Sequence, residues 1–234
     1  EIGSGLVGSE MCIRDSGYIV LSPQVLHAGN YGVPESRERV IFIGIRKDAL
    51  KEEIAQILKN DLIPNHLNPY PQPTHNCTLN DETLATPVVL CDVLKQLKEP
   101  KESFDPSQRF YSKAKYMGAH CQGQKEITMN SIGPTIRSEH HGNIEYRRLS
   151  LEHGGTNKNE LEKGLAERRL TPRECALIQT FPPDFQFVIP KDYDWKRFIV
   201  SASGAYKVIG NAVPPILAYH IAMRIQNLWS TYFK

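Results

Sequence analysis

The sequence lacks any long apolar run. No stretch reaches the roughly 20 consecutive apolar residues that a helix needs to span a bilayer, and the first residues do not have the pattern of a secretion signal. Hydrophobic residues make up 40% of the 234 positions and charged residues 23%, which excludes disordered, collagen-like and coiled-coil proteins. Lysine and arginine exceed aspartate and glutamate only by 28 to 26, so charge neither requires nor excludes a nucleic-acid partner. We expect a globular protein without a membrane partner.

Cysteine is scarce and irregularly spaced. The five cysteines form no Cys-x-x-Cys pair, which argues against a structural zinc site and against a thioredoxin-like centre. The adjacent His140 and His141 have no cysteine or aspartate at ligand spacing either. We therefore expect no metal, and reduced thiols in a cytoplasm.

A glycine-rich stretch near the start is a weak signal. Residues 3–8 spell G-x-G-x-x-G, but that dinucleotide fingerprint needs a strand before it and a helix after it. Only two residues precede it, and the following SEMCIRDS is a poor helix former. We interpret residues 1–16 as a non-native junction, such as adaptor or cloning sequence.

The rest of the chain divides into three stretches. In residues 17–60, the apolar run Tyr18–Ser22 predicts a strand, and the helical spacing of Ala49–Leu58 predicts a helix. Between them, the six apolar residues Val40–Ile45 predict a strand buried on both faces, typical of a layered α/β sheet. Residues 61–167 begin with the proline-rich linker Ile63–Thr74 and predict a loop-rich smaller domain with little helix.

Helix signals are clearest in residues 168–234. Thr171-Pro172-Arg173-Glu174 forms a capping box with proline at the first helical position, and the helix must end before Phe181-Pro182-Pro183. Asn211 is expected to cap a second helix. The apolar residues expected on one face of that helix are Val213, Leu217, Ile221, Ile225 and Leu228.

Two arginines precede the central strand. Arg37 and Arg39 stand two residues apart, so in extended chain their side chains lie on the same side and could converge on one pocket. A guanidinium suits carbonyl and phosphate oxygens because its donors form a rigid fork. The alternative is two solvated arginines that protect an aggregation-prone strand.

Three blocks together resemble one known family. YGVPESRERVIFIG is similar to motif VIII of the DNA cytosine-5 methyltransferases, RRLTPRECA with Gln179 and Phe181-Pro182 is similar to motif IX, and AYKVIGNAVPP is similar to motif X. They occur in the family's order. The resemblance implies an α/β fold: the C-terminal part of a Rossmann-like S-adenosylmethionine-dependent methyltransferase domain with an inserted loop-rich target-recognition domain.

The domain organisation follows from the same resemblance. Residues 17–60 would end the catalytic domain, residues 61–167 would form the target-recognition domain, and residues 168–234 would return to the catalytic domain.

The resemblance also implies a specific chemistry. Members of the family flip a cytosine out of duplex DNA, attack its C6 with a cysteine thiolate, and methylate C5 from S-adenosylmethionine. By resemblance, Arg39 would hold the flipped cytosine and help arrange the nucleophile, with Arg37 supporting it. Asn211 and Ala212 would help bind the methyl donor.

Contacts to double-stranded DNA are expected from the variable stretch. Thr135-Ile136 resembles the Thr–aliphatic pair found near the flipped base in many of these recognition domains. Arg137, Arg147 and Arg148 supply donors for base edges and phosphates. For each of them a solvated loop residue is the alternative interpretation.

The sequence departs from the family's pattern. No cysteine follows a proline, and the Glu-Asn-Val and F-x-G-x-G blocks are absent, so the nucleophile, the acid for cytosine N3 and the donor-binding loop are missing. Glu35 stands where glutamine is usual and is expected to pair with Arg37 or Arg39. Leu177 stands where arginine is frequent.

Two functional interpretations remain open. The first is a C-terminal fragment of a DNA cytosine-5 methyltransferase from a prokaryotic restriction–modification system, cytoplasmic and associated with the nucleoid, which is inactive without its missing N-terminal catalytic half. The second is a non-catalytic specificity subunit of a split methyltransferase. The Val40–Ile45 strand argues against the second, because at an incomplete sheet its apolar faces would be exposed.

Overall fold

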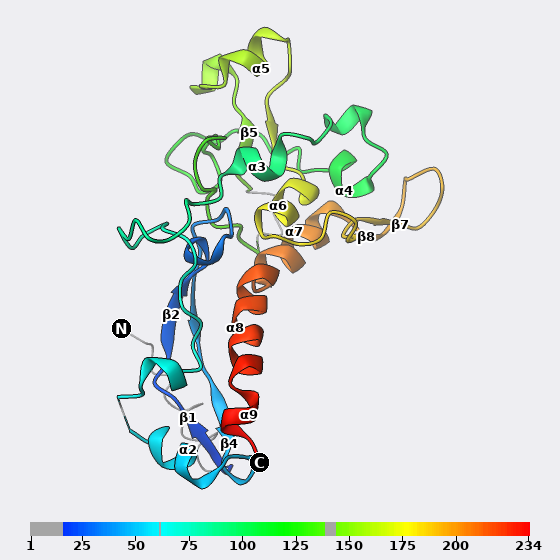
Figure 1. The fold of residues 1–234 in the computed structure, drawn as a ribbon. Helices are drawn as coiled ribbons and strands as arrows, with labels where there is room; N and C mark the ends of the chain where they lie inside the picture. The colour runs from blue at the N-terminus through cyan, green and yellow to red at the C-terminus, as the bar shows by residue number, and fades with distance from the viewer. Residues whose placement is uncertain (1–15, 61, 139–143) are drawn as a thin grey trace. The chain divides into compact units, whose positions relative to one another are not determined.

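The computed structural model describes residues 16–60, 62–138 and 144–234 (Figure 1). The G-x-G-x-x-G stretch, the double histidine and all of the proposed junction except Ser16 lie outside these ranges. Within them, no helix is long and apolar enough to cross a membrane. The same ranges contain no cluster of three or more His, Cys, Asp or Glu side chains that could hold a metal ion.

The chain forms two compact units, which are described separately. Unit 1 consists of the described residues before Ala28 together with Glu38–Pro73 and Ala218–Lys234, and unit 2 consists of Ala28–Arg37 and Thr74–Leu217. The change of unit at Pro73 falls in the predicted linker. Residues 168–217, which we expected to return to the catalytic domain, instead pack with the predicted recognition domain in unit 2.

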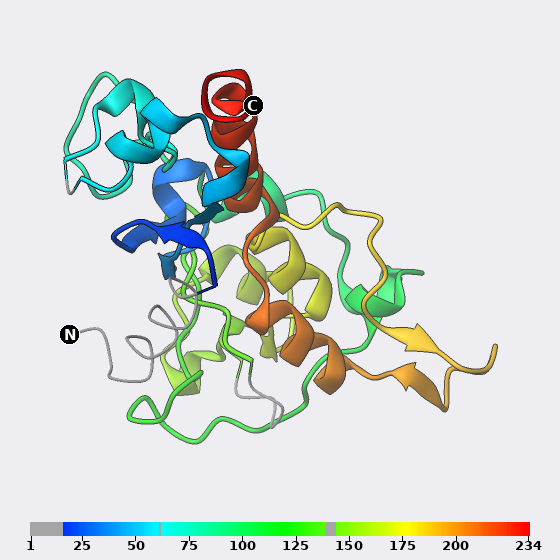
Figure 2. The ribbon, with the colours of Figure 1, turned by 90° about the horizontal axis from the view of Figure 1, so that it is seen from below.

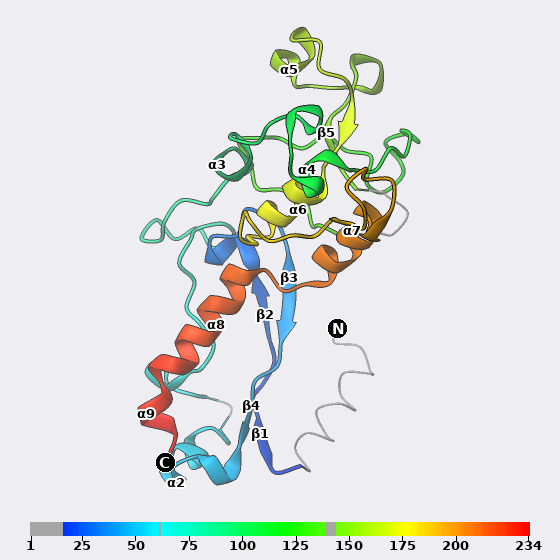
Figure 3. The ribbon, with the colours of Figure 1, turned by 90° about the vertical axis from the view of Figure 1, so that its right-hand side faces the viewer.

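Unit 1 is built on two antiparallel strand pairs. Figure 3 shows β1 beside β4 and β2 beside β3. Leu26 on β2 lies opposite Arg39 on β3. The elements of this unit are β1 (Tyr18–Val20), β2 (Gln24–His27), β3 (Glu38–Ile41), β4 (Gly44–Arg46), the 3-10 turns η2 (Lys47–Ala49) and η3 (Asn65–Leu67), and the helices α2 (Glu52–Ile57) and α9 (Trp229–Tyr232).

The core of unit 1 brings together its N-terminal strands and the C-terminal segment of the chain. Ile19, Ile54 and Leu228 belong to one buried apolar cluster that links β1, α2 and the C-terminal segment. The backbone N–H of Lys51 donates to the carbonyl of Tyr232 at 2.9 Å. The helix predicted over Ala49–Leu58 is present as the shorter α2, Glu52–Ile57, and Ala49 belongs to η2 instead.

The central strand differs from the expectation. Val40–Ile45 is divided between β3 and β4 because its two halves pair with different strands, β2 and β1. Val40 is 37% exposed, whereas Ile43 is only 6% exposed. The apolar run therefore has one buried face in this structure, and the prediction of a strand buried on both faces was wrong.

Unit 2 is rich in loops. The loop-rich smaller domain was predicted over residues 61–167, of which the described residues before Thr74 belong to unit 1. Helix α8 (Pro215–Asn227) begins in unit 2 and ends in unit 1. The other elements of unit 2 are η1 (Ala28–Tyr31), α3 (Leu90–Leu94), η4 (Pro100–Glu102), α4 (Pro106–Arg109), β5 (Tyr146–Arg148), η5 (Leu151–His153), α5 (Lys158–Glu162), β6 (Arg168–Arg169), α6 (Pro172–Ile178), β7 (Ile189–Pro190), β8 (Phe198–Val200) and α7 (Ala202–Asn211).

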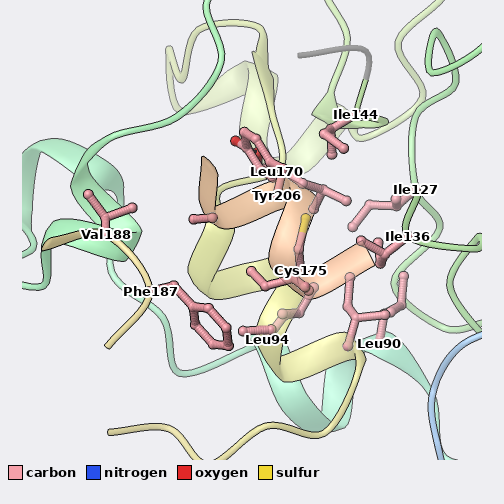
Figure 4. Close-up of a cluster of buried hydrophobic side chains, with 14 residues drawn as sticks. Leu90, Leu94, Ile127, Ile136, Ile144, Leu170, Cys175, Phe187, Val188 and Tyr206 are labelled. Carbon is pink, nitrogen blue, oxygen red and sulfur yellow. Dashed lines mark hydrogen bonds between the residues drawn. The ribbon is translucent and has the colours of Figure 1, made fainter. Parts of the chain in front are cut away.

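Helices α6 and α7 form the centre of unit 2. Figure 2 shows α6 (yellow) close to α7 (orange), with the β7–β8 hairpin leading into α7. Their buried faces meet side chains from the loop-rich stretch, among them Leu90 and Ile136 (Figure 4). The Tyr206 hydroxyl donates to the carbonyl of Leu170 at 2.7 Å, which fixes α7 against the residue that precedes the N-cap of α6.

The capping box of α6 is confirmed. The Glu174 N–H donates to the Thr171 hydroxyl at 3.0 Å, and the Thr171 N–H donates to the Glu174 carboxylate at 2.8 Å. The helix ends at Ile178, before Phe181, as proline requires.

The prediction for Asn211 was wrong. Asn211 is the last residue of α7 and does not cap α8. Helix α7 was missed because its short Ser201-Ala-Ser-Gly opening resembles a turn, although the Ser201 hydroxyl accepts the Gly204 N–H at 3.3 Å as an N-cap.

We predict that Thr171→Ala lowers the free energy of unfolding by roughly 2 kcal/mol, because it removes the cap and leaves a buried amide without its partner. The Thr171 hydroxyl donates to the Gln108 side chain at 2.6 Å in addition to capping the helix. Urea unfolding measures the difference. Thr171→Ser is the matched control and should cost much less, and equal losses in the two variants would contradict the assignment.

Candidate functional site

Arg37 is a buried arginine that joins three segments of unit 2. It is 1% exposed. Nη1 donates to the carbonyl of Ile136 at 2.9 Å, and Nη2 donates to the carbonyls of Gly210 at 2.7 Å and Ala212 at 2.9 Å. The motif VIII segment, the loop with Thr135-Ile136 and the motif X turn therefore meet at one guanidinium.

Glu35 completes this arrangement. One carboxylate oxygen lies 3.4 Å from Nη1 of Arg37 and accepts the N–H of Ile136 at 2.6 Å. Both groups of the pair are buried. Glu35 was expected to pair with Arg37 or Arg39, and in the structure it pairs with Arg37. A carboxylate at this position supplies the counter-charge that a buried guanidinium requires.

The backbone around Glu35 runs beside the loop that carries Thr135. The Ser36 N–H donates to the carbonyl of Gly133 at 2.8 Å, and the Gly133 N–H donates to the carbonyl of Pro34 at 2.9 Å. The half-buried Thr135 hydroxyl donates to the carbonyl of Ser36. Ile136 is fully buried in the core of unit 2, so the Thr–aliphatic pair is fixed from both sides.

The motif X turn also approaches this loop closely. A Cβ atom on Gly210 would lie 2.3 Å from the backbone carbon of Arg137 and 2.4 Å from the nitrogen of Ser138. Those atoms belong to the backbone, so they have little freedom to move away. The Gly210 of the I-G-N-A-V block is therefore required by packing, which the sequence alone does not show.

Arg39 has different surroundings from Arg37. It lies on β3 in unit 1, is half-buried, and its Nη1 donates to the carbonyl of the adjacent Glu38 at 2.6 Å. The two arginines belong to different units, and a pocket shared by them stays a prediction. The role of Arg39 toward a flipped base stays a prediction.

Arg147 and Arg148 are directed into the protein. Nη2 of Arg148 lies 2.7 Å from the Glu99 carboxylate, and Nη1 forms an ion pair with Glu160. Nη2 of Arg147 lies 2.6 Å from Glu160. Both arginines are buried, so their donors are used inside the protein. This geometry does not support the DNA contacts that we expected from them.

Sequence reasoning missed the charged network to which these arginines belong. Arg168 binds Glu174 through both Nη atoms, at 2.8 and 2.9 Å, and lies 3.1 Å from Glu99. Glu174 thus caps α6 and also pairs with Arg168. The motif IX block therefore braces unit 2 internally.

Arg137 is the predicted DNA-binding arginine that keeps access to solvent. Its side chain is 32% exposed, and Nη2 lies 2.6 Å from the Glu145 carboxylate. Burial raises the pKa of Glu145 although the positive charge of Arg137 acts to lower it.

The residues expected at the methyl donor lie beside the Arg37 contacts. Asn211 is exposed and Ala212 is half-buried, with its carbonyl held by Arg37. An exposed carboxamide next to a fixed turn can both donate and accept hydrogen bonds. These two residues therefore fit a polar contact to S-adenosylmethionine, and that role stays a prediction.

Comparison with known sequences identifies the family. Residues 12–227 match the family described as C-5 cytosine-specific DNA methylase. The chain belongs to this family. The match begins within residues 1–16, the stretch interpreted above as a junction.

Individual members of the C-5 cytosine-specific DNA methylases are similar over nearly the whole chain. Type II methyltransferase M.BspRI of Lysinibacillus sphaericus is 32% identical over 225 residues, covering 94% of this chain and 46% of the relative. Type II methyltransferase M.FnuDI of Fusobacterium nucleatum is 28% identical over 235 residues, covering 92% and 57%. The chain thus spans about half the length of these relatives.

A solved structure supports the fold. The S. pombe Dnmt2 methyltransferase aligns with a TM-score of 0.53 and 15% sequence identity, covering 97% of this chain and 63% of that chain. The predicted α/β methyltransferase fold is confirmed by this similarity.

We predict that Arg37→Ala lowers the free energy of unfolding by about 3–5 kcal/mol, because it leaves buried Glu35 without its counter-charge. Glu35→Gln keeps an acceptor for Ile136 and should cost less. A double-mutant cycle read by urea unfolding should show coupling between the two positions. Arg39→Ala is the control, with an expected loss below about 0.5 kcal/mol. Equal losses at positions 37 and 39 would refute this account.

A pH dependence follows from Glu99. Burial acts to raise the pKa of this carboxyl, but hydrogen bonds and charge from Arg168 and Arg148 outweigh it, so the pKa lies below its ordinary value of 4.5. A carboxyl whose pKa is lower in the folded protein than in the unfolded chain stabilises the fold at pH above its ordinary pKa. This contribution to the free energy of unfolding is lost as the pH falls through the folded-state pKa.

Glu99→Gln should therefore be less stable than the wild type at neutral pH, and the difference should shrink as pH falls below the ordinary value of 4.5. Urea midpoints measured across this range test the prediction. The control is Glu102→Gln, because Glu102 is an exposed glutamate without an ion pair in the described part of the chain. A deficit at Glu99 that is independent of pH would contradict the prediction.

Proposed function

We propose that this chain is the C-terminal part of a DNA cytosine-5 methyltransferase of a restriction–modification system. Such an enzyme transfers a methyl group from S-adenosylmethionine to C5 of a flipped cytosine in double-stranded DNA. The observation that carries the proposal is the set of Arg37 contacts, which join the motif VIII segment, the Thr135-Ile136 loop and the motif X turn. The similarity of this chain to Type II methyltransferases supports the assignment to a restriction–modification system.

Each of the site residues has a separate proposed role. Arg39, half-buried on β3 opposite Leu26, would donate to the flipped cytosine. Arg37 would act indirectly, by positioning the loop of Thr135 and the turn of Asn211. Arg137 would contact DNA. S-adenosylmethionine supplies the methyl group when bound, and Asn211 with Ala212 would hold its polar part.

The nucleophile is expected from outside this chain. Burial raises the pKa of Cys175 well above its ordinary value, because the thiol lies in the core of unit 2. Burial also raises the pKa of Cys77. Thiols in such environments are poor nucleophiles, and no cysteine of the sequence follows a proline. We therefore propose further that the chain is a fragment whose activity requires an N-terminal catalytic half.

A split enzyme is the second candidate. Unit 2 has an apolar core of its own, built from the loop-rich stretch together with α6 and α7. A separate specificity subunit that pairs with a catalytic chain would need such a core.

We expect the purified chain alone to transfer no methyl group to duplex DNA, because it supplies neither a reactive cysteine nor an acid for cytosine N3. Incorporation of labelled methyl from S-adenosylmethionine measures this, with an intact Type II methyltransferase as the positive control. Incorporation by the chain alone would overturn the fragment proposal.

The DNA upstream of the Gly17 codon separates the two candidates. A continuous reading frame that encodes Pro-Cys and Glu-Asn-Val blocks supports a fragment of one enzyme. A start codon near residue 1 without those blocks supports the split subunit.

A further inference from the structure

A cavity of about 480 Å³ lies in unit 2. Residues 109–113, at and after the end of α4, line one side, and Phe198 with the first turn of α7 lines the other (elements in Figure 1). None of these residues takes part in the Arg37 contacts. The volume falls within the range of pockets that hold small organic ligands.

Aromatic rings form the apolar wall of the cavity. The centroids of Phe110 and Phe198 lie 4.8 Å apart in an edge-on arrangement. Trp195, which is not among the lining residues, packs edge-on against Phe110 from behind this wall, with their ring centroids 5.6 Å apart. Rings held by such contacts offer a rigid surface to another planar ring.

Two exposed cations accompany these rings. The Arg109 guanidinium lies 5.2 Å from the centre of the Trp195 ring, and Nζ of Lys113 lies 3.4 Å from the centre of the Tyr111 ring. No aspartate or glutamate is among the described residues that line the cavity. The charged residues that line the cavity are thus of one sign.

These cations differ from the buried arginines of the same unit. Arg148 and Arg168 are each paired with carboxylates of the protein. Arg109 and Lys113 have no ion pair within the described ranges of the chain, and each lies against an aromatic face instead. A cation held in that way keeps its charge available for an external anion.

We propose that this cavity binds a nucleotide, with the base against Phe110 and Phe198 and the phosphate beside Lys113 and Arg109. Base–aromatic stacking and a cationic phosphate contact are the usual elements of sequence-tolerant nucleotide binding. Two sources have this chemistry: an unpaired nucleotide of a DNA strand and a free nucleotide. The first source rests on the proposed function, and the second does not.

Fluorescence of Trp195 provides the test. The sequence has two tryptophans, so Trp229→Phe in the full chain leaves Trp195 as the only reporter. Titration with deoxycytidine monophosphate and with a single-stranded oligodeoxynucleotide should each give a saturable change in emission. Deoxycytidine and inorganic phosphate, which each carry half of the chemistry, should bind more weakly than the nucleotide.

Lys113→Gln and Lys115→Gln form a matched pair in this background. Both lysines are exposed and belong to the same segment, but Lys115 does not line the cavity. Lys113→Gln should weaken nucleotide binding about fivefold or more, as expected for loss of a charge-assisted contact, and Lys115→Gln should leave it unchanged. No saturable signal, or equal effects of the two substitutions, would overturn the inference.

Comparison of the oligonucleotide with the free nucleotide shows which of the two is the natural ligand of the cavity. Tighter binding of the oligonucleotide than of the free nucleotide supports a DNA strand, and the reverse order supports a free nucleotide. The proposed function is tested separately, by methyl transfer after the chain is joined to an N-terminal catalytic half. Transfer without cavity binding overturns only this inference, and cavity binding without transfer overturns only the proposed function.

Discussion

The buried guanidinium of Arg37 is the constraint on which the arrangement of unit 2 depends. A charge removed from water is costly unless it is paired and hydrogen-bonded. Here one carboxylate and three carbonyls provide those contacts. The carbonyls come from segments that are about 100 and 175 residues away in the sequence. The three segments must therefore be in place together for the charge to be buried.

Glycine and motif IX make that assembly possible. Gly210 allows the motif X turn to approach the Arg137 backbone, which any Cβ atom would prevent. The paired charges of Arg168, Glu174 and Glu99 brace β6 and α6 in the same unit. The blocks that resemble motifs VIII, IX and X thus act as one structural assembly around the recognition loop. In the proposed enzyme that assembly would carry the Thr135-Ile136 pair and the turn of Asn211.

Local chemistry could be predicted from the sequence, but burial could not. The Thr171 capping box depends on neighbouring residues, so its geometry was predicted correctly. Arg147 and Arg148 appeared to be exposed donors because the sequence does not show that the chain folds back to bring Glu160, 13 residues from Arg147, and Glu99, 49 residues from Arg148, against them. The Val40–Ile45 run was read as one strand because the sequence does not show that its halves pair with different strands. The family could be predicted because its blocks are short, local and ordered along the chain.

Amide hydrogen exchange in the wild type and in Arg37→Lys tests the central claim most directly. Lysine keeps the positive charge but cannot bridge three carbonyls with one rigid fork. The amide of Ile136 is bonded to Glu35 and that of Ala212 to Ile209, whereas the amide of Cys175 is internal to α6. Exchange at Ile136 and Ala212 should accelerate at least about tenfold with Cys175 unchanged. Unaltered protection at both amides would show that Arg37 does not hold the segments together.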